Sequence, residues 1–229
     1  MFPVVIHDED KELPKDNCMY VIADNGVFKK TNTGIYEALV PCSFESIKAS
    51  ADSIEPYCKL AITKMPQKLV WQAKHFFAEV VEKFGAESVV VICYNRELDE
   101  YKFYVPQQRV SRTGIFYAYK IVDDPEYAGY DEIGTIHSHC DFDAFHSGTD
   151  DRDEHKWDGI HITFGHNNQD NFTITSSLMV TQNRFTIDSL EVMEGIASRD
   201  GRFFLNEVSD SQKQEWIEDK VNWIKRVES

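Results

Sequence analysis

The chain lacks the features of a membrane-spanning, secreted or nucleic-acid-binding protein. No stretch approaches about 18 consecutive apolar residues, and the first residues show no basic region followed by a long apolar run, so neither a membrane helix nor a secretory signal is expected. Only 24 residues are basic against 39 acidic, and the resulting net charge of −15 would repel nucleic acid and attract basic partners. These absences favour a cytoplasmic protein.

Cysteine is scarce and poorly placed for a structural role. The five cysteines are odd in number, widely spread and without a Cys-x-x-Cys pair: they are Cys18, Cys42, Cys58, Cys93 and Cys140. Neither a disulfide framework nor a zinc finger is therefore indicated.

The length and the pattern of apolar residues predict an α+β protein that begins with a small β-rich domain. With 229 residues and 42% hydrophobic content, the chain fits one domain plus an appendage, or two small domains. In residues 1–62, Asn25-Gly26 lies between two apolar runs, which is a signal for a type I′ hairpin, and Gly34–Pro41 is another strand candidate. We expect these residues to form the β-rich domain.

The main domain is predicted over residues 63–200 and opens with a helix. Residues 65–84 carry apolar side chains at helical spacing, with Pro66 near the start and Gly85 just past the end. Further elements follow in order: strands over 86–93, 101–105, 114–119, 131–139, 159–164, 172–175 and 177–181, and an amphipathic helix over 209–227 within a C-terminal segment 201–229. Strands and helices in this order indicate the α+β class.

Two histidines lie two residues apart on a predicted strand. The segment Asp131–His139 carries the apolar residues Ile133 and Ile136 and is expected to be buried. Because residues two apart in a strand point to the same face, His137 and His139 project together. Neutral imidazoles are good Zn²⁺ ligands, and a catalytic zinc usually has three protein ligands and one position for water. One more ligand is therefore needed.

A short segment after the histidines offers that ligand. Ser147 and Asp150 are spaced as in an N-terminal capping box, which would begin a short helix and hold Asp150 in its first turn. Asp150 could then be the third zinc ligand, and the Ser147 hydroxyl could face the reacting carbonyl. Each piece alone has a plainer explanation, a helix cap or a surface or core histidine, but the four residues at fixed offsets together favour a metal site.

Other side chains near this segment are expected to have supporting or structural roles. Cys140 should point to the opposite face of the strand and pack there, and His146 should lie in the loop and support the site. His161 and His166 lack partner spacing and are expected to be structural. Six carboxylates between residues 141 and 154 form either a solvated loop or a patch that steers a basic substrate tail: Asp141, Asp143, Asp150, Asp151, Asp153 and Glu154.

The order His137-x-His139, seven residues, Ser147, two residues, Asp150 resembles the motif of the JAMM (JAB1/MPN/Mov34) zinc metalloproteases. The surrounding HSGTDDRDEHKWDGIHITFG resembles the prokaryotic JAB branch, and the resemblance covers roughly residues 65–187. It implies a cytidine-deaminase-like, curved β-sheet flanked by helices, with Zn²⁺ bound by His137, His139 and Asp150. A small β-rich domain before the catalytic domain is also found in some prokaryotic members.

The family also uses an upstream glutamate, which the resemblance places at Glu87. In the family this residue is a general base and lies on a strand after the first helix, and Glu87 opens the predicted strand 86–93. The family segment commonly reads Glu-x-x-Gly-x-Leu-x-Gly, and Val90 and Tyr94 stand where glycines are usual. Other candidates are Glu79 and Glu82 on the helix, and Glu97 and Glu100 in a turn.

The resemblance implies a peptidase that uses a zinc-activated water. Glu87 would take the proton from the water and return it to the leaving amine, while Ser147 would donate a hydrogen bond to the oxyanion. The implied bond follows the C-terminal glycine of ubiquitin or a ubiquitin-like protein, in a conjugate or a precursor, as in a deubiquitinase. An operon with an activating-enzyme-like protein, sometimes in antiphage defence, is the implied setting. The alternatives are a small-molecule amidase, a phage structural-protein processing protease, and a noncatalytic MPN scaffold.

Overall fold

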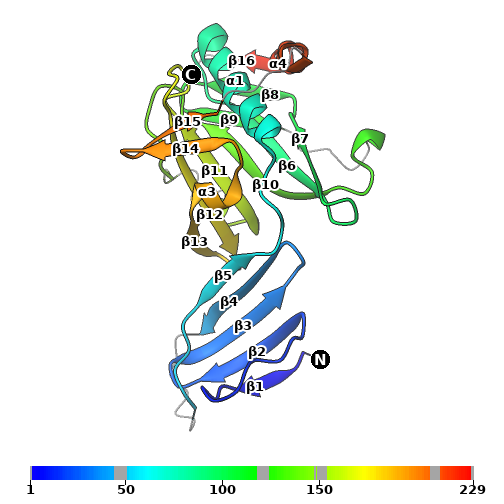
Figure 1. The fold of residues 1–229 in the computed structure, drawn as a ribbon, viewed down its shortest axis with the longest axis vertical. Helices are drawn as coiled ribbons and strands as arrows, with labels where there is room; N and C mark the ends of the chain where they lie inside the picture. The colour runs from blue at the N-terminus through cyan, green and yellow to red at the C-terminus, as the bar shows by residue number, and fades with distance from the viewer. Residues whose placement is uncertain are drawn as a thin grey trace. The chain divides into compact units, whose positions relative to one another are not determined.

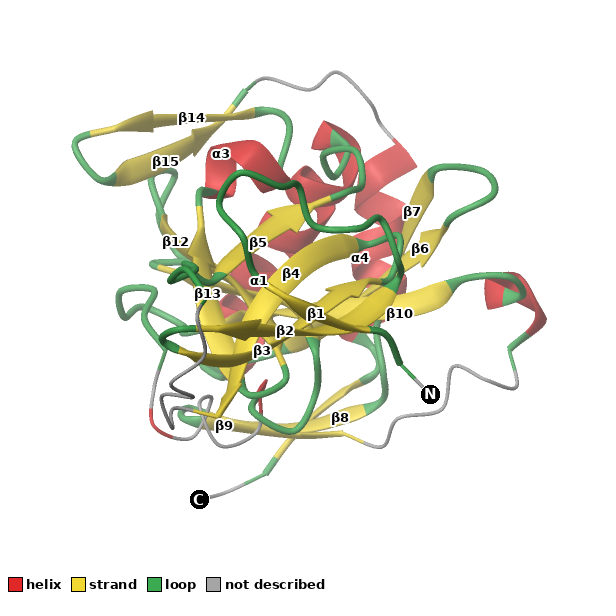
Figure 2. Ribbon diagram, turned by 90° about the horizontal axis from the view of Figure 1, so that it is seen from below, coloured by secondary structure: helices red, strands yellow, loops and turns green. Residues whose placement is uncertain are grey.

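The chain folds into two compact units, seen here in a computed structural model (Figure 1). The structure describes residues 2–43, 51–117, 124–146, 148, 154–206 and 212–227. One unit comprises Met1–Ile62 with Val180–Phe185, and the other comprises Thr63–Met179 with Thr186–Ser229. The described α-helices all belong to the second unit, whereas the first is built of strands (Figure 2), so the chain is an α+β protein. No helix in the described ranges is both long and apolar enough to cross a membrane.

The first unit is a five-stranded sheet. Its strands lie in sequence order: β1 (Val4–Ile6), β2 (Cys18–Ala23), β3 (Gly26–Asn32), β4 (Tyr36–Ser43) and β5 (Tyr57–Leu60). Strands β1 and β2 are parallel, and the other neighbours are antiparallel. Alternate residues of the central strands, Met19, Val21, Phe28 and Leu39, form its buried cluster with Ala23. One face of the sheet thus supplies the core of this unit.

The β2–β3 hairpin forms where it was predicted, but its turn differs. Ala23 pairs with Gly26, so the loop consists of Asp24 and Asn25. A type I′ turn requires positive φ at both loop residues, and neither adopts it. The side-chain amide of Asn25 instead exchanges two hydrogen bonds with the backbone of Ile54, at 2.9 and 3.1 Å. This contact with a distant segment outweighs the local preference of the Asn-Gly pair.

The second unit is built on strands of a six-stranded sheet of order β13-β12-β11-β10-β6-β7. The strands are β6 (Val89–Asn95), β7 (Glu100–Tyr104), β10 (Asp131–Ser138), β11 (Gly159–Gly165), β12 (Thr173–Val180) and β13 (Asn183–Ile187). The central strand β10 is antiparallel to β6 and parallel to β11. The sequence predicted two strands over 172–175 and 177–181, but β12 is continuous because its residues pair without a break with β11.

Helix α1 (Gln67–Phe84) packs against this sheet. It follows Pro66 and ends at Gly85, whose φ of 53° is the left-handed conformation typical of a C-terminal cap, as predicted. Phe77 contacts Phe164 of β11 edge to face, with ring centroids 5.8 Å apart. On another side of the helix, Phe76 contacts Trp216 of α4 (Gln212–Val221) at 6.2 Å. Helix α1 is therefore held by both the sheet and the C-terminal helix.

The C-terminal segment differs from the single helix predicted over 209–227. Helix α4 ends at Val221, and the chain continues into strand β16 (Ile224–Arg226), which pairs in parallel with β8 (Gln108–Ser111). The buried side chain of Ile224 and a hydrogen bond from Val227 N–H to the Val110 carbonyl favour this strand over further helix. The remaining elements are β8 (Gln108–Ser111) and β9 (Gly114–Tyr117), which complete a sheet of order β16-β8-β9, the 3-10 helix η1 (Pro125–Tyr127), helix α3 (Ser189–Val192), and a hairpin of β14 (Ile196–Arg199) and β15 (Arg202–Leu205).

Candidate functional site

Strands β10 and β11 present a polar row on one face of the sheet. They run parallel with Thr135 opposite His161 and His137 opposite Thr163. Each pair is in contact: Thr135 Oγ1 lies 3.2 Å from His161 Nδ1, and Thr163 Oγ1 lies 3.3 Å from His137 Nε2. Because side chains alternate along a strand, the opposite face carries the buried apolar residues Ile136, Ile160, Ile162 and Phe164. The polar face is the floor of the candidate site.

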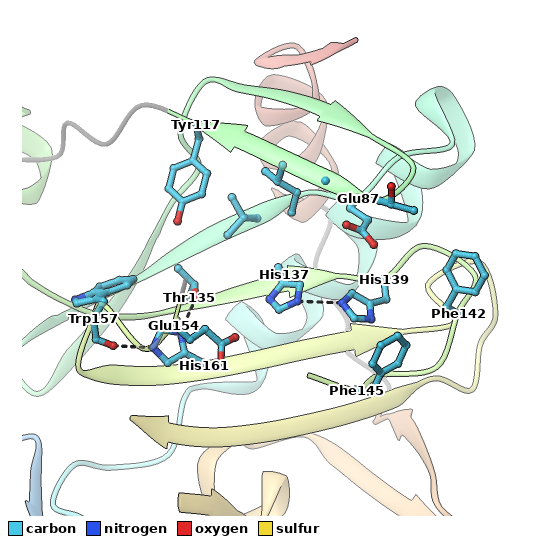
Figure 3. A pocket seen from close by; sticks show the side chains of 14 residues that line it. Glu87, Tyr117, Thr135, His137, His139, Phe142, Phe145, Glu154, Trp157 and His161 are labelled. Carbon is cyan, nitrogen blue, oxygen red and sulfur yellow. Dashed lines mark hydrogen bonds between the residues drawn. The ribbon is translucent and has the colours of Figure 1, made fainter. Parts of the chain in front are cut away.

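His137 and His139 point their Nε2 atoms at each other. The two atoms are 3.2 Å apart (Figure 3), and the side chains are 8 % and 4 % exposed. Two nitrogens bound to one zinc at 2.0–2.1 Å with tetrahedral angles would be about 3.3 Å apart. The pair therefore has the spacing and the donor chemistry of two ligands to one metal ion.

Two predicted site residues cannot be placed relative to the histidines. Ser147 and Asp150 lie outside the described residues. Within the described ranges, no third His, Cys, Asp or Glu side chain joins the two histidines in a metal-binding group. The assignment of Asp150 as the third ligand stays a prediction.

Glu87 lies beside the two histidines. It lines the same pocket as His137 and His139, and its carboxylate is directed toward them (Figure 3). The residue does not open a strand as predicted, because β6 begins at Val89 and the Glu87 N–H donates to the Ser111 carbonyl at 2.9 Å instead. None of the other candidate glutamates lines this pocket: Glu79 pairs with Lys83, Glu100 accepts from Tyr130, and Glu82 and Glu97 are exposed.

Buried side chains fix the backbone just after Glu87. The Gln108 side chain accepts a hydrogen bond from Val89 N–H at 2.8 Å and donates one to the Val89 carbonyl at 2.9 Å. Ser88 N–H donates to Ser138 Oγ, and Ser138 N–H donates back to the Ser88 carbonyl, both at 2.9 Å. Since Ser138 lies between the two histidines, these bonds link the backbone of the candidate base to that of the candidate ligands.

His137, His139 and Glu87 line a pocket of about 560 Å³. Trp157 and Tyr117 lie at one end, Phe142 and Phe145 lie at the other, and the histidines lie between them (Figure 3). The other lining residues are Val89, Thr113, Gly114, Ile115, Thr135, Glu154 and His161. The pocket thus has aromatic side chains at both ends and polar side chains between them.

Glu154 is a pocket residue that the sequence did not reveal. The sequence placed it in an acidic segment expected to be either a solvated loop or a patch that steers a basic substrate tail, and in the structure it is only 6 % exposed and lines the pocket. Its carboxylate lies 3.6 Å from Nδ1 of the partly buried His146, and its carbonyl accepts a hydrogen bond from Trp157 N–H. One sequence feature could have indicated this. Glu154 and Trp157 are three residues apart, and residues at this spacing lie on the same side of a helical turn.

Three side chains that the sequence assigned to structural or packing roles contact the surrounding protein. His161 Nε2 lies 3.1 Å from the Trp157 carbonyl, which can only accept, so Nε2 carries the proton and Nδ1 accepts from Thr135. Cys140 is buried, its thiol donates to the Arg112 carbonyl, and burial raises its pKa to about 12. His166, expected to be structural, contacts Asp143 at 2.8 Å.

The described part of the site thus joins two convergent histidines, a glutamate and an aromatic pocket on one face of a sheet. The 3.2 Å between the two histidine nitrogens is compatible with shared ligation of one metal ion. No protein-family model matches the chain, and no curated protein is significantly similar to it.

Proposed function

We propose that the chain is a zinc-dependent metallopeptidase of the JAMM type that hydrolyses the bond after the C-terminal glycine of ubiquitin or a ubiquitin-like protein. The observation that carries the proposal is the 3.2 Å separation of the His137 and His139 Nε2 atoms in a pocket shared with Glu87. The substrate class comes from the resemblance of the His-x-His, Ser and Asp motif to the JAMM family. The α+β fold, in which a helix precedes the strand that follows Glu87, is compatible with that family.

The donor set fits zinc. His137 and His139 would hold the ion together with Asp150, leaving room for one more ligand. When bound, Zn²⁺ lowers the pKa of water toward about 7 and polarises a carbonyl group. Imidazole and carboxylate ligands of this kind suit zinc better than calcium or magnesium, which prefer oxygen ligands alone.

The protein's own groups would handle the proton and the developing charge. Glu87 is half-buried, and its backbone N–H is hydrogen-bonded to the Ser111 carbonyl. Its carboxylate could accept a proton from the attacking water and pass it to the leaving amine. Ser147 would donate a hydrogen bond to the tetrahedral oxyanion. The buried row of Thr135, His161 and Thr163 keeps the floor of the pocket ordered during these steps.

The rim of the pocket favours a peptide or protein substrate over a small amide. Tyr117, Phe142 and Phe145 line the pocket and are 37 %, 42 % and 51 % exposed. Exposed aromatic side chains around a pocket are typical of surfaces that contact a macromolecule. This observation supports a ubiquitin-like protein or its conjugates as partner, with an activating-enzyme-like protein as a second partner implied by the resemblance.

Metal analysis combined with cleavage assays tests the proposal. Purified wild type should contain about one zinc per chain and cleave a ubiquitin-like fusion after its terminal glycine. Glu87→Gln should retain zinc but lose roughly 10²–10⁴-fold in kcat/KM, while Asp150→Asn should lose both zinc and activity. Glu79→Gln is the matched control, because Glu79 pairs with Lys83 outside the pocket. This variant should cleave the fusion as fast as the wild type.

Different failures identify different alternatives. Zinc binding with no cleavage of any substrate would indicate a noncatalytic scaffold. Cleavage of short amides or of a phage structural protein, but not of ubiquitin-like fusions, would indicate an amidase or a processing protease. Normal activity of Glu87→Gln would show that another group acts as the base.

A further inference from the structure

The chain turns sharply directly after His139. Strand β10 ends at Ser138, and the N–H of His139 makes one more hydrogen bond to β11, to the Phe164 carbonyl at 2.8 Å. The next residue, Cys140, has a φ of 42°, in the left-handed region that residues with a side chain rarely adopt. A backbone in this region persists only where its surroundings hold it. Pairing between the strands does not supply that hold, because it stops at His139.

The buried residue Asn167 holds both sides of this turn. It is 0 % exposed, and its Nδ2 donates to the Phe164 carbonyl at 2.7 Å and to the Cys140 carbonyl at 3.4 Å. The N–H of Asn167 also donates to the Cys140 carbonyl, at 2.8 Å. One residue thus binds the carbonyl that receives the His139 N–H and the carbonyl of the residue that follows His139.

A buried lysine anchors the backbone of Asn167. Lys74 of α1 is 5 % exposed, and its Nζ donates to the Asn167 carbonyl at 2.8 Å. The same Nζ lies over the Phe172 ring, 5.4 Å from its centroid. A charged donor makes a stronger hydrogen bond than a neutral one. Helix α1 and the turn after His139 are therefore connected through this asparagine.

We propose that Asn167 is a positioning residue that fixes His139 for metal binding. The His139 Nε2 stays 3.2 Å from the His137 Nε2 only while the backbone that carries the imidazole is fixed. Without the Nδ2 donors, the turn at Cys140 would relax toward a less strained φ, and the imidazole of His139 would move with it. The metal part of this inference rests on the proposed function, whereas the hold on the backbone does not.

Zinc affinity of two matched variants tests the metal part. Asn167→Ala removes the Nδ2 donors. Asn95→Ala is the control, because Asn95 is also buried and its side-chain oxygen also makes two hydrogen bonds to the backbone, to Glu97 N–H and Leu98 N–H, outside the pocket. In competition with a chelator, we expect Asn167→Ala to bind zinc roughly 10- to 100-fold more weakly than the wild type. Asn95→Ala should bind zinc as tightly as the wild type.

Amide hydrogen exchange of the metal-free protein tests the hold on the backbone. In Asn167→Ala, the His139 amide should exchange roughly tenfold faster relative to the amide of Ile92 in the core strand β6, as the loss of one hydrogen bond would give. Taking the ratio to Ile92 removes any general loss of stability. Asn95→Ala should leave this ratio unchanged.

A folded Asn167→Ala that binds zinc as tightly as the wild type would overturn the proposal, even if its Tm falls, because a merely structural role lowers stability alone. If the wild type binds no zinc, the proposed function is refuted, and the exchange ratio of His139 decides whether Asn167 fixes the turn. If the variant does not fold, the wild type decides. The side-chain NH₂ of Asn167 should exchange at least about tenfold more slowly than that of the exposed Asn222, and equal rates would overturn the proposal.

Discussion

Replacing Gln108 with methionine should destabilise the second unit by roughly 2–6 kcal/mol. The Gln108 side chain is 2 % exposed and makes two short hydrogen bonds to the backbone of Val89, at 2.8 and 2.9 Å, and a longer one to the Pro106 carbonyl at 3.4 Å. Methionine has a similar length but no group that can replace the amide. Each buried backbone group left without a partner costs about 1–3 kcal/mol, so the N–H and carbonyl of Val89 together give roughly 2–6 kcal/mol.

Thermal unfolding measures this effect, and the chain provides a matched control. For a unit of this size, the expected loss lowers Tm by about 4–24 °C. Gln107 is the adjacent residue, is exposed, and has the same side chain, so Gln107→Met should leave Tm within about 2 °C of the wild type. If the two variants unfold at the same temperature, the hydrogen bonds of the Gln108 amide to Val89 do not contribute to stability. The backbone beside Glu87 would then be fixed by other contacts.

Two further predictions concern buried titratable groups. Burial lowers the pKa of Lys74 from 10.5 to about 8, so the unfolded chain keeps this proton at higher pH than the folded chain. The free energy of unfolding of the wild type relative to Lys74→Met should therefore rise between about pH 8 and 10.5 in urea titrations, and a constant difference would contradict the burial argument. Burial also raises the pKa of Cys140 to about 12, whereas Cys42 is exposed. Iodoacetamide at about pH 8 should modify Cys42 well before Cys140, as followed by mass spectrometry, and equal rates would show that the bend after His139 opens in solution.

The elements that the sequence predicted well are those set by local pattern. Helix α1 could be predicted because its apolar stripe lies between Pro66 and Gly85, two residues that favour a helix start and a helix end. The convergence of His137 and His139 followed from strand alternation alone. Both predictions depend on residues that are close in the chain, where few other conformations compete.

The features that the sequence did not predict depend on contacts between distant residues. Glu154 lies in an acidic run that is typical of a solvated loop, and only the fold turns it into the pocket. Likewise, Ile224 continues the apolar spacing of the preceding helix, but its backbone pairs with β8, more than a hundred residues earlier. The hydrogen bonds between the Gln108 side chain and the Val89 backbone correspond to no sequence motif. In each case the partner of a side chain or backbone group is distant in the sequence and is brought close only by the tertiary fold.

The alternation along β10 and β11 separates two kinds of evolutionary change. Thr135, His137 and His161 face the pocket, whereas Ile136 and Ile162 on the reverse side are buried in the core. Substitutions at the first set change what the pocket accepts, and substitutions at the second change how firmly the core is packed. A library that keeps His137 and randomises only the other pocket-facing positions of these two strands should therefore retain mostly folded proteins while it samples new specificities.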